Sequence, residues 1–194
     1  MDRLFVSMDL PQAIKEAAGI VQKRLRETGA DVSWTRPEGM HLTLKFLGDV
    51  EKKRLQDIQA ALTETGGSFH PITIAIEGLG GFPTLDKPRE IWLGLKEPSG
   101  ELIGLQKRMD RALALLGFPQ ESRDFHPHLT LGRVRSHRDG GALLQALKVL
   151  DPVRLGEWRL GEINLMQSAL RPGGSVYTKL WTVKAVKIDN PNKM

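Results

Sequence analysis

Strand-like and helix-like segments alternate along almost the whole of this 194-residue chain, and this alternation restricts its fold more than any other feature. Apolar residues at strand spacing predict strands at 4–10, 32–35, 40–48, 72–79, 90–95, 128–134, 157–170 and 176–186. Apolar residues at helical spacing predict helices at 11–28, 51–64, 99–116 and 141–150. Many neighbouring strands are joined by turns too short for a parallel crossover, so we expect an α+β fold with antiparallel sheets.

Composition limits the class of protein and its surroundings. An apolar content of 40% and a charged content of 26% are typical of a folded chain, and 194 residues suit one domain, or two intimately joined lobes, over 1–194. The chain has no cysteine, which excludes disulfides and cysteine-built metal sites and fits a reducing cytoplasm. No apolar run has the length of a membrane span or the form of a signal peptide. The net charge of +5 favours an anionic partner, with nucleic acid as the first candidate.

The phrase His-Leu-Thr-Leu occurs twice, at His41–Leu44 and at His128–Leu131. Two copies arise by chance in only about one chain in a thousand of this composition. Because side chains alternate along a strand, each copy turns its histidine and threonine to one face and its leucines to the other. The same parity places Lys45 on the face of the first histidine, and Met40 and Phe46 on the face of the leucines. We therefore expect two apolar strand faces against a core and two His–Thr pairs in a cleft.

Two histidines in one cleft suit acid–base catalysis of phosphoryl transfer. A neutral imidazole can take a proton from water while a protonated one gives a proton to a leaving oxygen. The hydroxyls of Thr43 and Thr130 can donate to phosphate oxygens, where negative charge grows in the transition state. Such a set of groups needs no side-chain nucleophile.

The chain resembles the two-histidine (2H) phosphoesterases, and closely the LigT-like RNA 2′,3′-cyclic phosphodiesterases, also called 2′-5′ RNA ligases. The resemblance rests on four segments, RLFVSMDLP, WTRPEGMHLTLKFLG, GGFPTLDKPREIWLGL and FHPHLTLGRV. It implies a bilobal α+β fold in which two antiparallel sheets face a central cleft, with helices on their outer faces. It also implies hydrolysis of 2′,3′-cyclic phosphates on RNA ends or small cyclic nucleotides to 2′-phosphates, without metal or cofactor, by a monomer. Weak reverse 2′-5′ ligation is a further implication.

The resemblance assigns His41 as the proton donor and His128 as the proton acceptor, with Thr43 and Thr130 beside them. His126 shares the face of His128 by alternation, so parity alone does not choose between them. The motif does, because the threonine two positions on belongs to His128, as Thr43 belongs to His41. His126 precedes a proline at the entry of the strand, a position at which proline is tolerated, and we expect it to lie at the strand edge.

Basic residues are candidates for substrate binding, namely Arg133, Lys45, Lys87 and Arg89. Arg133 matches the family pattern H-x-T-x-x-R, although strict alternation turns it away from His128 unless a bulge at Gly132 re-aims it. It would hold the phosphate or stack on the terminal base. Lys45 is a candidate because strand alternation places it on the same face as His41. The other two lie in the loop before the strand at 90–95, where they would meet more distant phosphates.

Two other functions compete with this hypothesis. A metal-dependent hydrolase would use His126 and His128 as a ligand pair, although only Asp124 stands nearby to extend the set. An RNA-binding module without catalysis would fit the positive charge, but aromatic residues make up only 6% of the chain and duplicated His–Thr pairs have no purpose in it. The physiological RNA and the direction of proton transfer stay open at this point.

Overall fold

The computed structural model describes residues 1–67, 69–136, 140–151, 153–172 and 174–186. The strands are β1 (Asp2–Asp9), β2 (Val32–Trp34), β3 (His41–Val50), β4 (Ile72–Phe82), β5 (Glu90–Lys96), β6 (His128–Val134), β7 (Arg154–Leu160), β8 (Glu162–Arg171) and β9 (Gly174–Lys184). The α-helices are α1 (Gln12–Arg26), α2 (Leu55–Gly66), α3 (Glu101–Leu115) and α4 (Gly140–Leu150), and 3-10 turns lie at η1 (Pro37–Gly39) and η2 (Lys52–Arg54). The predicted α+β class is confirmed.

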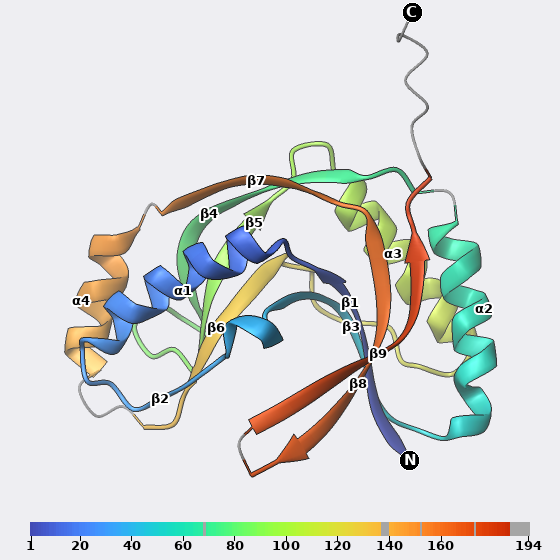
Figure 1. Cartoon of the computed structure of the whole chain (residues 1–194), viewed down its shortest axis with the longest axis horizontal. Helices are drawn as coiled ribbons and strands as arrows, with labels where there is room; N and C mark the ends of the chain where they lie inside the picture. The colour runs from blue at the N-terminus through green and yellow to red at the C-terminus, as the bar shows by residue number, and fades with distance from the viewer. Residues whose placement is uncertain (68, 137–139, 152, 173, 187–194) are drawn as a thin grey trace, which may run out of the picture.

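The strands form one curled antiparallel sheet in the order β7-β4-β5-β6-β3-β1-β8-β9, with β2 paired to β6 (Figure 1). The two sheets expected from the resemblance are the two halves of this sheet. One half contains β7, β4, β5, β6 and β2, and the other contains β3, β1, β8 and β9. The residue pair Leu42 and Leu129 links β3 to β6 and so joins the halves.

Each half of the sheet has its own pair of helices. Helices α1 and α4 contact β7 and β4, whereas α2 and α3 contact β9, β8 and β3, and Figure 1 shows the two pairs at opposite ends of the molecule. The leucines of both repeated phrases face the core, and all are almost fully buried: Leu42, Leu44, Leu129 and Leu131. The predicted burial of these four leucines is therefore confirmed. Among the described residues, no helix is both long and apolar enough to cross a bilayer.

The strand predicted at 157–170 is wrong in extent. A break at Gly161 divides it into β7, which pairs with β4, and β8, which pairs with β1 and β9. The chain thus passes from one half of the sheet to the other at this glycine. The apolar residues mark the break, because they lie at even positions before Gly161 (Trp158 and Leu160) and at odd positions after it (Ile163 and Leu165), a change of parity that one regular strand does not make.

Candidate active site

The two His–Thr pairs meet where the halves of the sheet join. Leu42 and Leu129 are paired directly and have no exposed surface. Because neighbouring side chains alternate, the residues on either side of this pair project together from the opposite face. These are the half-buried His41 and Thr43 of β3 and His128 and Thr130 of β6. The fold therefore brings all four predicted catalytic residues to one place.

The same backbone contact orients both imidazole rings. Nδ1 of His41 lies 2.8 Å from the carbonyl oxygen of Gly39, and Nδ1 of His128 lies 2.7 Å from the carbonyl oxygen of His126. A carbonyl only accepts, so each Nδ1 carries the proton and donates it. A neutral ring held in this way presents an unprotonated Nε2 and can act as a base, whereas a protonated ring can donate from Nε2 as an acid. His126 contributes through its backbone, while its own side chain is exposed at the strand entry, as predicted.

Aromatic rings enclose His41 on two sides. Its ring stacks on Phe5 of β1 at a centroid distance of 4.7 Å and meets the edge of Tyr177 of β9 at 5.1 Å. Burial lowers the pKa of His41, although the carbonyl of Gly39 and the charge of Asp9 act in the opposite direction. The free protein therefore holds His41 mainly neutral near pH 7. A hollow of about 90 Å³ lies beside this ring, lined in part by Asp9 and Tyr177.

His128 has aromatic neighbours of its own, from the other half of the sheet. The edge of its ring meets Phe82 of β4 at 5.1 Å, and Trp92 of β5 lies at 6.3 Å. Gly80 makes room for this tryptophan, since a Cβ at Gly80 would lie 2.1 Å from the indole ring. The buried indole nitrogen of Trp92 has no hydrogen-bond partner within the described part of the chain. Packing therefore fixes both histidine rings, and different strands contribute the aromatic side chains around each.

Glu90 of β5 links three predicted site residues, and sequence reasoning missed it. Its carboxylate accepts a hydrogen bond from the Thr130 hydroxyl at 2.6 Å and lies 3.4 Å from Nε2 of His128. Its second oxygen lies 3.4 Å from a guanidinium nitrogen of Arg133. The sequence signal was weak, because one glutamate at the start of a strand resembles any solvent-facing residue.

Arg133 reaches this face through a bulge in β6. Trp92 pairs with Thr130 and Ile91 with Gly132, so the pairing skips Leu131 and the alternation shifts by one residue. Gly132 also permits the close approach of β2, since a Cβ there would lie 2.7 Å from the Val32 side chain. The predicted bulge is confirmed, and it turns Arg133 toward the site.

A matching bulge in β3 makes the parity prediction for Lys45 wrong. Ser7 pairs with Thr43 and Val6 with Lys45, so the register skips Leu44. Lys45 consequently enters the core, where its ammonium forms an ion pair with Asp110 of α3.

The ammonium of Lys45 also donates to the carbonyl of Pro119 at 2.7 Å, which leaves it no route to the cleft. Phe46, expected in the core, is instead 58% exposed, and its ring lies 6.1 Å from Phe5, which stacks on His41. The site therefore lacks a predicted cation, and an aromatic ring expected in the core is exposed beside Phe5.

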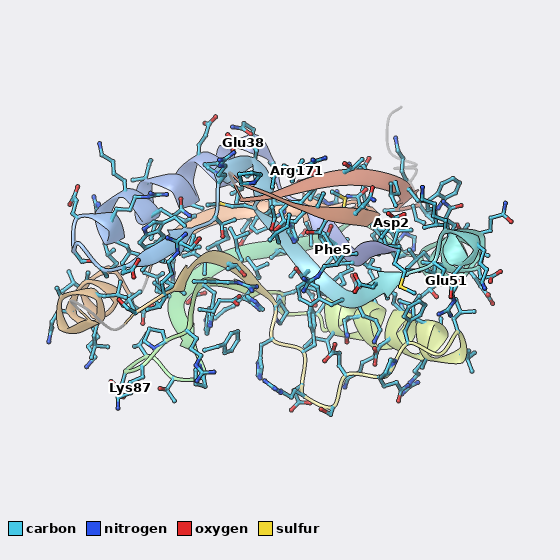
Figure 2. The ribbon with its side chains drawn as sticks, turned by 90° about the horizontal axis from the view of Figure 1, so that it is seen from below. Asp2, Phe5, Glu38, Glu51, Lys87 and Arg171 are labelled. Atoms are coloured by element: carbon cyan, nitrogen blue, oxygen red, sulfur yellow. The ribbon has the colours of Figure 1, made fainter. Side chains whose placement is uncertain are left out.

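Lys87 and Arg89 are exposed in the loop between β4 and β5. Figure 2 shows Lys87 at the edge of the molecule, well apart from Phe5. The loop leaves β4 at Phe82, the residue that contacts His128, and returns when the backbone N–H of Arg89 donates to the Phe82 carbonyl at 2.6 Å. Both cations therefore lie on an extension of the His128 side of the site. Within the described ranges, no three potential metal-ligand side chains gather.

Comparisons with known proteins identify the family of this chain. The sequence model of the 2′-5′ RNA ligase superfamily matches residues 11–171. An Archaeoglobus fulgidus protein named RNA 2′,3′-cyclic phosphodiesterase is 36% identical over 178 residues, which are 92% of this chain and 97% of that protein. A Methanothermobacter thermautotrophicus protein of the same name is 35% identical over 178 residues, 92% of this chain and 96% of that one.

Solved structures share the fold. A Thermus thermophilus protein superimposes with a TM-score of 0.80 at 26% identity, covering 94% of this chain and 97% of that one. Escherichia coli LigT in complex with 3′-AMP gives a TM-score of 0.75 at 24% identity, covering 96% and 99%. Fold and motifs together define a two-histidine phosphoesterase. The chain belongs to the 2′-5′ RNA ligase superfamily, and the LigT-like resemblance is confirmed.

Proposed function

We propose that this chain hydrolyses 2′,3′-cyclic phosphates at RNA ends to 2′-phosphates, with His41 and His128 as an acid–base pair. One observation carries the proposal: two His–Thr pairs project from one face of the sheet, and both rings have Nδ1 tied to a carbonyl. That arrangement leaves both Nε2 atoms for proton transfer. The named relatives support the substrate class, since several are called RNA 2′,3′-cyclic phosphodiesterase.

In the proposed reaction, a water oxygen attacks phosphorus in line with O3′, and the P–O3′ bond breaks. His128 accepts the proton that water loses, and His41 donates a proton to O3′, which leaves as a hydroxyl. The product keeps its phosphate on O2′. The same step with a 5′-hydroxyl in place of water as the attacking group would form a 2′-5′ phosphodiester, a weak ligation.

Burial supports His41 as the donor. A lowered pKa makes a protonated imidazole a stronger acid, which favours transfer to a poor leaving group such as an alkoxide. It also keeps the ring mainly neutral before substrate binds. The negative charge of a bound phosphate next to His41 would favour the protonated form of the imidazole. Substrate binding would therefore help to protonate the proton donor.

The remaining residues have supporting roles in the proposal. The hydroxyls of Thr43 and Thr130 donate to the non-bridging phosphate oxygens, and Arg133 neutralises the charge that grows on them. Lys87 and Arg89 contact phosphates further along an RNA strand. We further propose that the protein works as a monomer on RNA ends or small cyclic nucleotides in the cytoplasm.

Phosphorus NMR of the product tests the proposed function directly. The purified protein is incubated with adenosine 2′,3′-cyclic phosphate or a short cyclic-ended RNA, with EDTA in excess. We expect a 2′-phosphomonoester as the product and the same rate with and without EDTA. A 3′-phosphate product, or activity that disappears with EDTA and returns with a divalent metal, would contradict the proposal.

A further inference from the structure

Glu90 places a carboxylate among the groups that are proposed to bind the substrate phosphate. Oε1 accepts from the Thr130 hydroxyl at 2.6 Å and lies 3.4 Å from Nε2 of His128, while Oε2 lies 3.4 Å from Arg133. A hydroxyl, an imidazole and a guanidinium therefore converge on one anion. These are the donor types that bind a phosphate through its oxygens.

The carboxylate is ionised in this position. Burial alone would raise the pKa of Glu90, but the hydrogen bonds from His128 and Thr130 and the charge of Arg133 outweigh it and hold the pKa below its usual value. Its backbone is fixed as well, because Glu90 pairs with Arg133 and Ile91 pairs with Gly132 in the sheet. A bound phosphate can turn the side chain aside but cannot carry its charge far from the cleft.

We propose that Glu90 is a specificity-determining residue, which occupies the phosphate position in the free protein and makes the cleft select singly charged phosphodiesters over doubly charged phosphomonoesters. The inference rests on the proposed function and deepens it. The cyclic substrate carries one negative charge, whereas the 2′-phosphate product carries nearly two at pH 7.5, since the second pKa of a phosphomonoester is about 6.

Charge repulsion gives this selection its physical basis. Every anion that enters must replace Glu90 at Thr130 and Arg133, and it then remains near the displaced carboxylate. The repulsion grows with the charge of the ligand, so it acts about twice as strongly on the product as on the substrate. The cleft would thus accept the cyclic ester and release the monoester.

Equilibrium binding at pH 7.5 to wild type and to Glu90→Gln tests the proposal without any need for turnover. The two probes are adenosine 2′-monophosphate, which is nearly doubly charged, and 2′-deoxyadenosine 3′-(methyl phosphate), an unreactive singly charged diester. Glutamine keeps the shape and one acceptor oxygen but removes the charge. We expect the Kd of the monoester to fall at least about ten times more than the Kd of the diester.

Glu77→Gln is the matched control, because this glutamate of β4 also pairs with two cations, Lys96 at 2.9 Å and Arg154 at 3.4 Å. It should leave the ratio of the two Kd values as in wild type. If Glu90→Gln fails to fold, as thermal melting would reveal, Glu90→Ala is measured instead with the same expectation.

The proposal is overturned if both Kd values change by the same factor, or if kcat falls while their ratio stays constant, because Glu90 would then only orient His128. Failure of the proposed function would look different. Wild type would not turn over the cyclic phosphate, yet the two probes would still report whether Glu90 selects by charge.

Discussion

The two half-sites of this protein share a motif and a backbone contact but differ in their surroundings. Both histidines donate from Nδ1 to the carbonyl two residues earlier, and both motifs are followed by a bulge. Around His41, the walls are aromatic rings from β1 and β9. Around His128, they are rings from β4 and β5, together with the carboxylate of Glu90.

In the proposed mechanism, one motif serves two opposite chemical tasks. The motif supplies an oriented imidazole and a hydroxyl, and it does so equally in both halves. The neighbours then set the charge around each ring, by burial at His41 and by a facing carboxylate at His128. We propose that the direction of proton transfer depends on strands that lie outside both motifs.

The largest expected effect is loss of either ring. His41→Ala and His128→Ala should each reduce kcat by about 10² to 10⁴, the usual contribution of a positioned acid or base. His126→Ala is the matched control, because His126 contributes its carbonyl and that variant keeps it. Steady-state rates on a mononucleotide cyclic phosphate measure all three. If His126→Ala were as damaging as His128→Ala, our choice between these two histidines would be wrong.

Replacing Lys45 should change the stability of the fold, whereas replacing Arg133 should change substrate binding, although both residues were predicted to bind substrate. Lys45→Ala leaves Asp110 buried without its partner and should lower the free energy of unfolding by about 3–5 kcal/mol. Arg133→Ala should leave stability unchanged and raise KM, because its side chain is 66% exposed beside the site. Chemical denaturation measures the first effect.

Lys53→Ala is the control for Lys45, since Lys53 pairs with Glu51 at the surface and its side chain is 78% exposed. It should cost less than about 1 kcal/mol. A similarly small loss for Lys45→Ala would argue that Lys45 is not held in the core.

A substrate with sulfur in place of O3′ should distinguish the two histidines. A thiolate leaves without a proton. The activity of a variant that lacks the acid should therefore be higher on this substrate than on the oxygen substrate, by about 10². We expect recovery for His41→Ala and none for His128→Ala, whose missing base is still needed. Recovery of the other variant would reverse the assigned roles while keeping the acid–base pair.

A smaller effect should come from the basic loop on the His128 side. Replacing Lys87 and Arg89 by alanine should raise KM for an oligonucleotide by about 3- to 10-fold at low salt, because each cation contacts a phosphate. Turnover of a mononucleotide cyclic phosphate should stay as in wild type. Added salt should weaken oligonucleotide binding more than mononucleotide binding, and equal salt dependence would remove the case for an extended RNA site.

The smallest effect concerns pH. Both kcat/KM and kcat should be bell-shaped, with limbs that belong to the coupled histidine pair. Burial lowers the pKa of His41, so its proton is lost at lower pH in the free protein, and the alkaline limb of kcat/KM should fall below pH 6.5.

Substrate charge favours the protonated ring, so the alkaline limb of kcat should lie at higher pH than that of kcat/KM. Rates measured from pH 5 to pH 9 test this order. An alkaline limb of kcat/KM above that of kcat would contradict the proposed role of His41.

The sequence by itself determined the elements and the four central residues of the site. Periodicity is a local property, and a repeated phrase in which a histidine precedes a threonine by two residues fixes which side chains share a strand face. The bulge next to Arg133 was also predictable, because a glycine inside a strand, here Gly132, often marks a β-bulge. The break at Gly161 was missed, although the parity of the apolar residues changes there, from Trp158 and Leu160 to Ile163 and Leu165.

Only the tertiary structure determined that Lys45 is buried, that Phe46 is exposed and that Glu90 lies in the site. The bulge in β3 follows from its pairing with β1, and nothing within the segment HLTLKF signals it. Glu90 reaches Thr130 because β5 pairs with β6, forty positions further along the chain. The packing of the whole sheet sets the register between distant strands, and this register determines which charged groups lie near each histidine. The histidines themselves could be identified from the repeated motif in the sequence.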